Sequence, residues 1–177
     1  TLVIIAGSTN GYVAEEILSS IGDLGDFDRK GFRRGLTVAP GCKLPKYEFP
    51  GDVVITDGVW QKGKTIFDVS SQLKAGDVIL KGANGFDENR QAAVQIGHPE
   101  GGTIHEALKS VYGRRVTLIF PVGLEKRLFG DVIELAMVVN AADAAGPRLY
   151  PAPGEIFTEQ DALESLYGVE CTVIAAG

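Results

Sequence analysis

Residues 1–11 read TLVIIAGSTNG, and this stretch decides the predicted fold. Thr1 to Ala6 form a largely apolar run rich in β-branched side chains, which is typical of a strand covered on both faces, as in a parallel sheet. Glycines and small polar residues follow. Beyond them, apolar residues recur at helical spacing from Val13 to Ile21, and Gly22 ends the pattern. The stretch therefore predicts a central strand, a turn and a helix.

The turn between this strand and this helix is the first candidate binding site. Glycines at Gly7 and Gly11 let the backbone approach a ligand closely, and free amides at the start of the helix point outward. Ser8, Thr9 and Asn10 add side-chain donors, so the turn suits a phosphate or a similar small anion. The alternative is that Ser8 or Asn10 only caps the helix. The turn has neither the lysine of a P-loop nor the three spaced glycines of a dinucleotide-binding fingerprint.

The rest of the sequence alternates between strand-like and helix-like patterns. Apolar runs predict strands over residues 36–39, 53–56, 77–80, 93–96, 116–120, 133–140 and 169–175. Helices are predicted over residues 104–111 and after Thr158, which suits an N-cap. Residues 62–64 suit a hairpin or an extended loop, and residues 146–154 a Pro-rich connection. The alternation predicts an α/β three-layer sandwich with a mostly parallel sheet of about six or seven strands.

The composition is that of one folded α/β domain over residues 1–177. With 45% hydrophobic residues, the chain can bury a core of the usual size. Its formal net charge of -6 opposes nonspecific attraction to nucleic acid, which depends on clustered lysine and arginine. The longest apolar runs are far shorter than the roughly 20 residues that cross a bilayer, and the first residues lack the basic flank of a secretory signal. We expect neither a nucleic-acid partner nor a membrane span.

The two cysteines, Cys42 and Cys171, are too few and too far apart for a disulfide framework or a metal cluster. Both are interpreted as packing or surface residues. We therefore expect a cytoplasmic protein that needs neither a metal nor a cofactor. A homo-oligomer is left open.

Further candidate sites follow other predicted strands, because ligands of an open parallel sheet bind outside the carboxyl ends of its strands. These segments are residues 57–58, 81–85 and 121–123. Lys81 could pair with a phosphate or stabilise an enolate oxygen, and Asp57 could carry a proton. The alternatives are a surface lysine and an ordinary Asp-Gly turn. Gly82 and Asn84 lie beside Lys81 in the sequence and are candidate ligand contacts.

Other titratable residues lie between the predicted elements. Glu88, next to Asp87, is a candidate base, and the alternative is a solvated charged loop. Either His98 or His105 could be catalytic, since imidazole as a group titrates near neutrality, although no further residue completes a metal-ligand spacing with them. Trp60 is interpreted as a core or crevice residue.

The order of these motifs resembles the superfamily of type A ribose-5-phosphate isomerases, glucosamine-6-phosphate deaminases, CoA transferases and the sugar-sensing domains of DeoR-type repressors. The matching segments lie in the first half of the chain: strand, GST at residues 7–9 and helix, then VITDG at 54–58 and ILKG at 79–82. The resemblance implies that Ser8 and Thr9 bind a substrate phosphate. It also implies that Asp57 faces the sugar and that Lys81 is the lysine of the active site.

Two positions depart from the isomerase pattern. The isomerase pattern has a second aspartate three residues beyond the first, and this chain has Trp60 at that position. The catalytic glutamate of the pattern lies nine residues beyond the lysine, and this chain has Arg90 at that position. Glu88 lies two residues before it. The resemblance therefore implies a related phosphorylated ligand more directly than it implies isomerisation.

Three hypotheses follow. The first is an enzyme that isomerises a small phosphorylated metabolite such as a sugar phosphate, with Lys81 stabilising charge and Asp57 or Glu88 moving the proton. The second is a noncatalytic domain that binds or senses a sugar phosphate. The third is a relative that handles CoA or acyl groups, for which Glu125 and Glu155 are positional candidates for the nucleophile.

Overall fold

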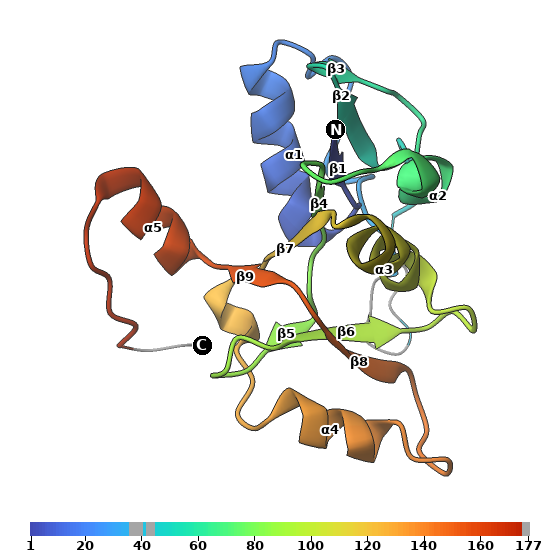
Figure 1. Cartoon of the computed structure of the whole chain (residues 1–177), viewed down its shortest axis with the longest axis vertical. Coiled ribbons are helices and arrows are strands. Elements are labelled where there is room, and N and C mark those ends of the chain that lie inside the picture. The colour runs from blue at the N-terminus through green and yellow to red at the C-terminus, as the bar shows by residue number, and fades with distance from the viewer. Residues whose placement is uncertain (36–40, 42–44, 175–177) are drawn as a thin grey trace.

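The computed structural model describes residues 1–35, 41 and 45–174 (Figure 1). The six strands of its main sheet lie in the order β3-β2-β1-β4-β7-β9. Their bounds are β1 Leu2–Ile4, β2 Val53–Thr56, β3 Val59–Trp60, β4 Val78–Leu80, β7 Thr117–Pro121 and β9 Glu155–Phe157. A second sheet contains β5 (Gly85–Phe86), β6 (Ala92–Ile96) and β8 (Arg148–Ala152), in that order. The helices are α1 Ser8–Ser20, α2 Ile66–Val69, α3 Gly102–Arg114, α4 Val132–Val139 and α5 Glu159–Tyr167, with short 3-10 helices η1 Ser70–Gln72 and η2 Leu124–Lys126.

The main sheet is mostly parallel. Neighbours among β1, β4, β7 and β9 pair in parallel, whereas β2 is antiparallel to β1 and β3 is antiparallel to β2. The predictions of an α/β fold and of a mostly parallel sheet are therefore confirmed. The three-layer sandwich stays a prediction, since the second sheet adds a part that this arrangement does not include.

The first strand is central and buried on both faces, as its apolar pattern predicts. Ile4 packs on one face with Leu18 of α1, and Ile5 packs on the other face with Ile104 of α3. All four side chains are at most 1% exposed. Burial of this kind stabilises a fold by about 25 cal/mol per Å² of apolar surface, so α1 is held against the sheet by the core beneath it.

The hairpin between β2 and β3 turns at Asp57-Gly58 and not at residues 62–64. Asp57 and Gly58 have φ values of 52° and 81°, and positive φ at both central residues is the requirement of the tight hairpin turn that Asp-Gly sequences favour. Since β2 runs antiparallel to β1, its carboxyl end lies at the opposite end of the sheet from the carboxyl ends of β1 and β4.

Three predicted elements in the second half of the chain are wrong. Residues 133–140 do not form a strand: residues 133–139 belong to α4, which the Asp131 side chain caps by accepting hydrogen bonds from two of its first amides, and Asn140 is the C-cap. Residues 146–154 contain β8, an edge strand that tolerates Pro151. Residues 169–174 form no strand, and β9 takes the last place in the main sheet.

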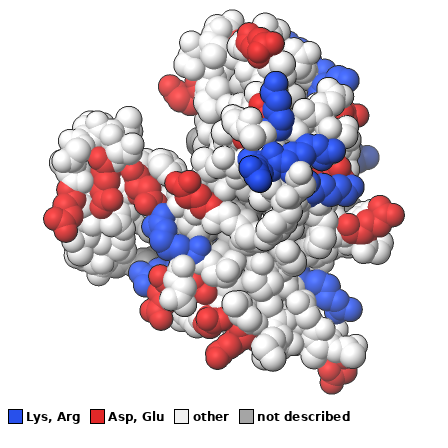
Figure 2. All heavy atoms as spheres, viewed as in Figure 1, with Lys and Arg blue, Asp and Glu red and all other residues white. Residues whose placement is uncertain are grey.

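The remaining predictions concern the strand over 36–39, the two cysteines, membrane spans and surface charge. The strand over 36–39 and Cys42 lie outside the described residues, whereas Cys171 is a free, half-buried thiol. None of the described helices has the length and apolar character needed to span a membrane. Figure 2 shows acidic and basic side chains interspersed over much of the visible face, with acidic side chains prominent on α5.

Candidate functional site

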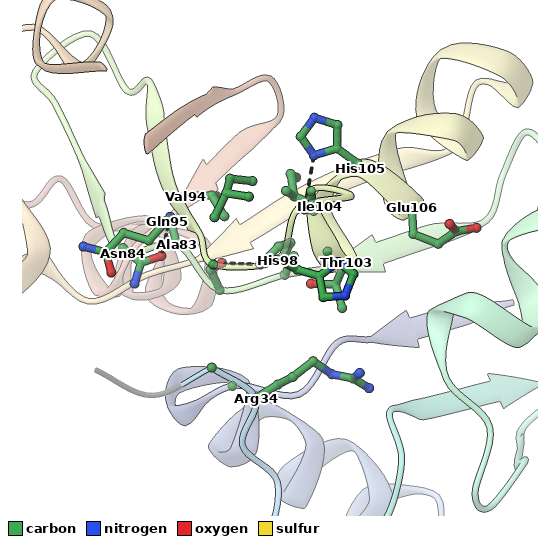
Figure 3. Close-up of a pocket in the computed structure, with 18 of the residues that line it drawn as sticks. Arg34, Ala83, Asn84, Val94, Gln95, His98, Thr103, Ile104, His105 and Glu106 are labelled. Carbon is green, nitrogen blue, oxygen red and sulfur yellow. Dashed lines mark hydrogen bonds between the residues drawn. The ribbon is translucent and has the colours of Figure 1, made fainter. Parts of the chain in front are cut away.

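A cavity of about 1090 Å³ lies where the carboxyl ends of β1 and β4 meet the end of β6 and the start of α3 (Figure 3). It is lined by residues 6–9, Arg34, Gly35, Phe67, 81–84, 94–98, 100–106, Lys109 and Lys126. Figure 3 shows Arg34 on one side and His98 and Thr103 on the other. The volume is slightly above the roughly 300–1,000 Å³ typical of small-molecule sites.

The start of α1 opens into this cavity. Gly7 is the N-cap residue, and no described side chain caps the helix, so the alternative in which Ser8 or Asn10 only caps α1 does not hold. The amides of Ser8 and Thr9 have no acceptor within the described part of the chain. Such amides, at the positive end of a helix, are a ready-made site for an anion.

Two of the predicted ligand residues serve the packing around this helix. Asn10 is fully buried, and its Nδ2 donates hydrogen bonds to the carbonyls of Ile5, at 2.8 Å, and Leu80, at 3.1 Å. It thereby ties α1 to the ends of β1 and β4. A Cβ at Gly11 would lie 3.1 Å from the Cβ of Arg29, so glycine allows close approach of the segment before Arg34. Neither Asn10 nor Gly11 lines the cavity.

Lys81 lies at the carboxyl end of β4 and lines the cavity, as do Gly82 and Asn84. Its Nζ donates to the carbonyl of Gly82 at 3.3 Å. Burial lowers the pKa of Lys81 to about 8, with the carboxylate of Asp52 opposing this effect and the guanidinium of Arg34 adding to it. The structure thus brings Lys81 to the same cavity as the start of α1.

Asp52 is a residue that sequence reasoning missed. Its carboxylate is fully buried and accepts hydrogen bonds from the amides of Ala6, at 2.9 Å, and Ile66, at 2.8 Å. It also pairs with Arg34 at 3.2 Å. Because β2 is antiparallel, its amino end shares one edge of the sheet with the carboxyl ends of β1 and β4. An aspartate directly ahead of an apolar run is the available signal, but in a fully parallel sheet that position would lie at the edge away from the ligand.

Arg34 contributes a second cation to the cavity. Its guanidinium carbon lies over the Phe49 ring, 4.7 Å from the ring centre, in a cation–π contact. Its Nε is buried and has no acceptor among the described residues. A buried donor without a partner is costly, so this atom is suited to an oxygen supplied by a ligand.

Lys126 is a third cation that the sequence did not single out. It follows β7 on η2, and its Nζ donates to the Thr9 hydroxyl at 3.3 Å and to the carbonyl of Ala83 at 3.4 Å. The predicted segment 121–123 does not itself line the cavity, but it leads the chain to Lys126. Lys126 therefore places positive charge beside the first turn of α1.

The two predicted bases lie elsewhere. Asp57 is exposed in the β2–β3 hairpin, at the opposite end of the main sheet from Lys81. Glu88 is exposed between β5 and β6, while its neighbour Asp87 is buried and accepts bonds from the amides of Gln91 and Val132. Neither Asp57 nor Glu88 lines the cavity, because the antiparallel course of β2 and the turn after β5 carry them away from it.

Glu106 is a carboxylate at the cavity that sequence reasoning missed. It accepts hydrogen bonds from Ser70, at 2.5 Å, and from Lys109, at 2.6 Å. Although burial acts in the opposite direction, the hydrogen bonds from Lys109 and Ser70 lower the pKa of Glu106, which keeps it ionised at neutral pH. Its position on α3, one residue after His105, was the only signal in the sequence.

Both histidines line the cavity, His98 from the loop before α3 and His105 from the first turn of α3. His98 accepts a hydrogen bond at Nδ1 from the amide of Glu100 at 3.2 Å, and His105 Nδ1 lies 3.1 Å from the carbonyl of Gly101. Gly101 is the N-cap, and no described side chain caps α3. Over the residues that the structure describes, no group of three or more His, Cys, Asp or Glu side chains could hold a metal ion.

Comparisons with known proteins add no assignment. No family model matches the chain, and no curated protein or solved structure matches it either. The resemblance to the sugar-phosphate isomerase superfamily therefore stays a prediction.

Proposed function

We propose that the cavity binds a small phosphorylated metabolite, with its phosphate at the start of α1. The observation that carries the proposal is the uncapped first turn of α1, whose amides at Ser8 and Thr9 open into the cavity beside Lys126. Lys81 and Arg34 add positive charge to the same cavity in a chain of formal net charge -6. Concentrated positive charge in a concave site attracts anions selectively.

A sugar phosphate fits the other groups of the cavity. Hydroxyl and amide side chains at Thr9, Asn84 and Thr103 can hydrogen-bond to sugar hydroxyls. Lys81 can stabilise a developing enolate oxygen, which is the role implied by the resemblance. With Asp57 and Glu88 distant, Glu106 is an ionised carboxylate that the cavity offers as proton acceptor.

A noncatalytic sugar-phosphate-binding domain is the second candidate. It is favoured by the placement of Asp57 and Glu88 outside the cavity, because binding requires the phosphate site but no base at either position. Neither Glu125 nor Glu155 lines the cavity, so the cavity offers no support for the acyl-transfer alternative. A cytoplasmic location and a three-layer sandwich are further parts of the proposal that follow from the sequence.

Thermal unfolding in the presence of ligands tests the proposal. Sugar phosphates should raise the melting temperature, whereas the same sugars without phosphate should not. A ligand at 100 times its dissociation constant should stabilise the fold by about 2.7 kcal/mol. No response to any phosphorylated sugar, nucleotide or CoA would contradict the proposal. If a sugar phosphate binds, Lys81→Ala separates the two candidates. Turnover by the unmodified chain that is lost in the variant identifies an enzyme. No turnover by either, with weaker binding in the variant, identifies a sensor.

A further inference from the structure

We propose that the amine of Lys81 forms an imine with a carbonyl group of the bound ligand, which makes the substrate class a phosphorylated aldehyde or ketone. This inference rests on the proposed phosphate site, because the phosphate would hold the carbonyl group within the cavity. It gives Lys81 covalent chemistry in place of a purely electrostatic role.

The first support is that Lys81 lines the cavity and forms no ion pair with any described side chain. Its backbone amide donates to the carbonyl of Ile119 at 2.9 Å, which fixes the residue at the end of β4. Its Nζ has one hydrogen bond, to the carbonyl of Gly82 at 3.3 Å, and no ion pair within the described ranges. One long bond to a neighbouring carbonyl leaves the amine available to a ligand.

The second support is the arrangement of charge around this amine. The nearby carboxylate of Asp52 already accepts bonds from Ala6, Ile66 and Arg34 and forms no hydrogen bond with Lys81 among those described. Burial and the nearby Arg34 disfavour the ammonium form more strongly than the Asp52 carboxylate favours it, so the pKa of Lys81 is lowered to about 8. A much larger fraction of this lysine than of an ordinary lysine is therefore neutral and nucleophilic near neutral pH.

The other lysines of the cavity are engaged differently. Lys126 donates to the Thr9 hydroxyl and to the carbonyl of Ala83, beside the proposed phosphate site. Lys109 is exposed and pairs with Glu106 at 2.6 Å. The two lysines therefore have different roles in the proposal: Lys126 binds the phosphate, and Lys81 reacts with the carbonyl group.

The step balances without an oxidant or a reductant. The lone pair of the neutral Nζ attacks the carbonyl carbon, and the resulting carbinolamine contains the former carbonyl oxygen as a hydroxyl. This oxygen leaves as water together with the two protons that the amine has lost, and a carbon–nitrogen double bond remains. Protonation of the imine creates an electron sink that acidifies the neighbouring carbon, which suits isomerisation or carbon–carbon bond chemistry.

Trapping with borohydride and pyridoxal 5′-phosphate tests the inference on the whole chain. This probe combines an aldehyde with a phosphate, and borohydride supplies the hydride that reduces the imine to a stable amine. Peptide mass spectrometry should find Lys81 labelled about tenfold faster than the exposed Lys74. The rate at Lys81 should be half-maximal near pH 8, and Lys81→Arg should lose this labelling while still binding pyridoxine 5′-phosphate, which lacks the aldehyde.

The controls separate failure of the imine from failure of the phosphate site. If pyridoxine 5′-phosphate binds in calorimetry but borohydride traps nothing at Lys81, the imine is overturned and the phosphate site stands. If pyridoxal, which lacks the phosphate, labels Lys81 as fast as its phosphate ester and inorganic phosphate gives no protection, the phosphate site is overturned. The expected result is preferential labelling by the phosphate ester, with protection by inorganic phosphate.

Discussion

The helices α1 and α5 begin in opposite ways. The first turn of α5 is closed by a capping box, in which the amide and hydroxyl of Thr158 both donate to the Asp161 carboxylate at 2.7 Å. The first turn of α1 contains no acidic residue, and its N-cap is Gly7. The difference follows the packing beneath each helix: α1 buries Ala14 and Leu18, whereas α5 has no fully buried residue.

A helix that packs on the core does not need a cap to form, because tertiary packing supplies most helical stability. The start of α1 can therefore leave its amides to a ligand, while α5 must satisfy its own. Figure 2 shows acidic side chains on α5, and two of them, Glu159 and Asp161, lie in its first turn and complement the positive end of the helix. We therefore expect binding at a helix start that packs on the core and whose free amides face a cavity.

The largest expected effect concerns the anchor beneath α1. Asp52→Ala removes the acceptor of the Ala6 amide and leaves Arg34 and Lys81 without their buried counter-charge. Breaking a buried pair in this way should lower the free energy of unfolding by about 3–5 kcal/mol. Urea denaturation measures the change. Asp161→Ala at α5 is the matched variant, and equal losses in the two would refute the distinction between an anchored and a self-capped helix start.

The next effect concerns the charge beside the open turn. Lys126→Ala should weaken binding of inorganic phosphate or a sugar phosphate about tenfold, or about 1.4 kcal/mol, because a charge-assisted hydrogen bond is lost. Isothermal titration calorimetry measures the affinity. Lys74→Ala, which removes an exposed lysine away from the cavity, should leave the affinity unchanged. A similar loss in both variants would indicate a general effect of net charge instead of a site.

A smaller effect is expected when the cap of α5 is removed. Thr158→Ala should lower the free energy of unfolding by about 1 kcal/mol, as is usual for an N-cap, and should not change phosphate binding. Thermal unfolding and calorimetry on the same sample test both statements. Altered phosphate affinity in this variant would show that the two helix starts are coupled and would contradict their separate roles.

The capping box also predicts a dependence on pH. Although burial acts in the opposite direction, hydrogen bonds from Arg90 and Thr158 lower the pKa of Asp161 below its ordinary value of 3.8. The folded state therefore gains stability above that value and loses it as the pH falls through the lowered pKa. Asp161→Asn should make the free energy of unfolding less steeply dependent on pH below 4. An unchanged slope in acid titrations followed by circular dichroism would contradict this.

Local patterns predicted the parts of the fold that local interactions determine. Residues 1–22 gave β1 and α1 correctly, because the apolar strand and the helical spacing both refer to neighbouring residues. The placement of Asp57 could not be predicted in the same way. It depends on whether β2 pairs parallel or antiparallel with β1, which is decided by contacts between distant segments.

The same reasoning explains the errors in the second half of the chain. The apolar run of α4 looks like a strand because it is apolar on most sides, with Met137 and Val138 both 73% exposed. Only the cap at Asp131 distinguishes it. At the cavity, Lys81 and the glycine-rich turn were predicted to be near each other because parallel strands share an edge. Asp52, Arg34, Lys126 and Glu106 reach that edge from a reversed strand, a loop, a 3-10 helix and a helix, which no local pattern reveals.

A substitution at Gly7 tests the central claim most directly. A Cβ at this N-cap position meets nothing within 4 Å and the backbone is extended, so Gly7→Asp can give α1 the cap that it lacks. The variant should unfold at a slightly higher temperature and should no longer bind inorganic phosphate, while Gly7→Ala keeps binding. Calorimetry with phosphate on both variants is decisive: undiminished binding in Gly7→Asp would contradict the claim that the open amides of α1 hold the anion.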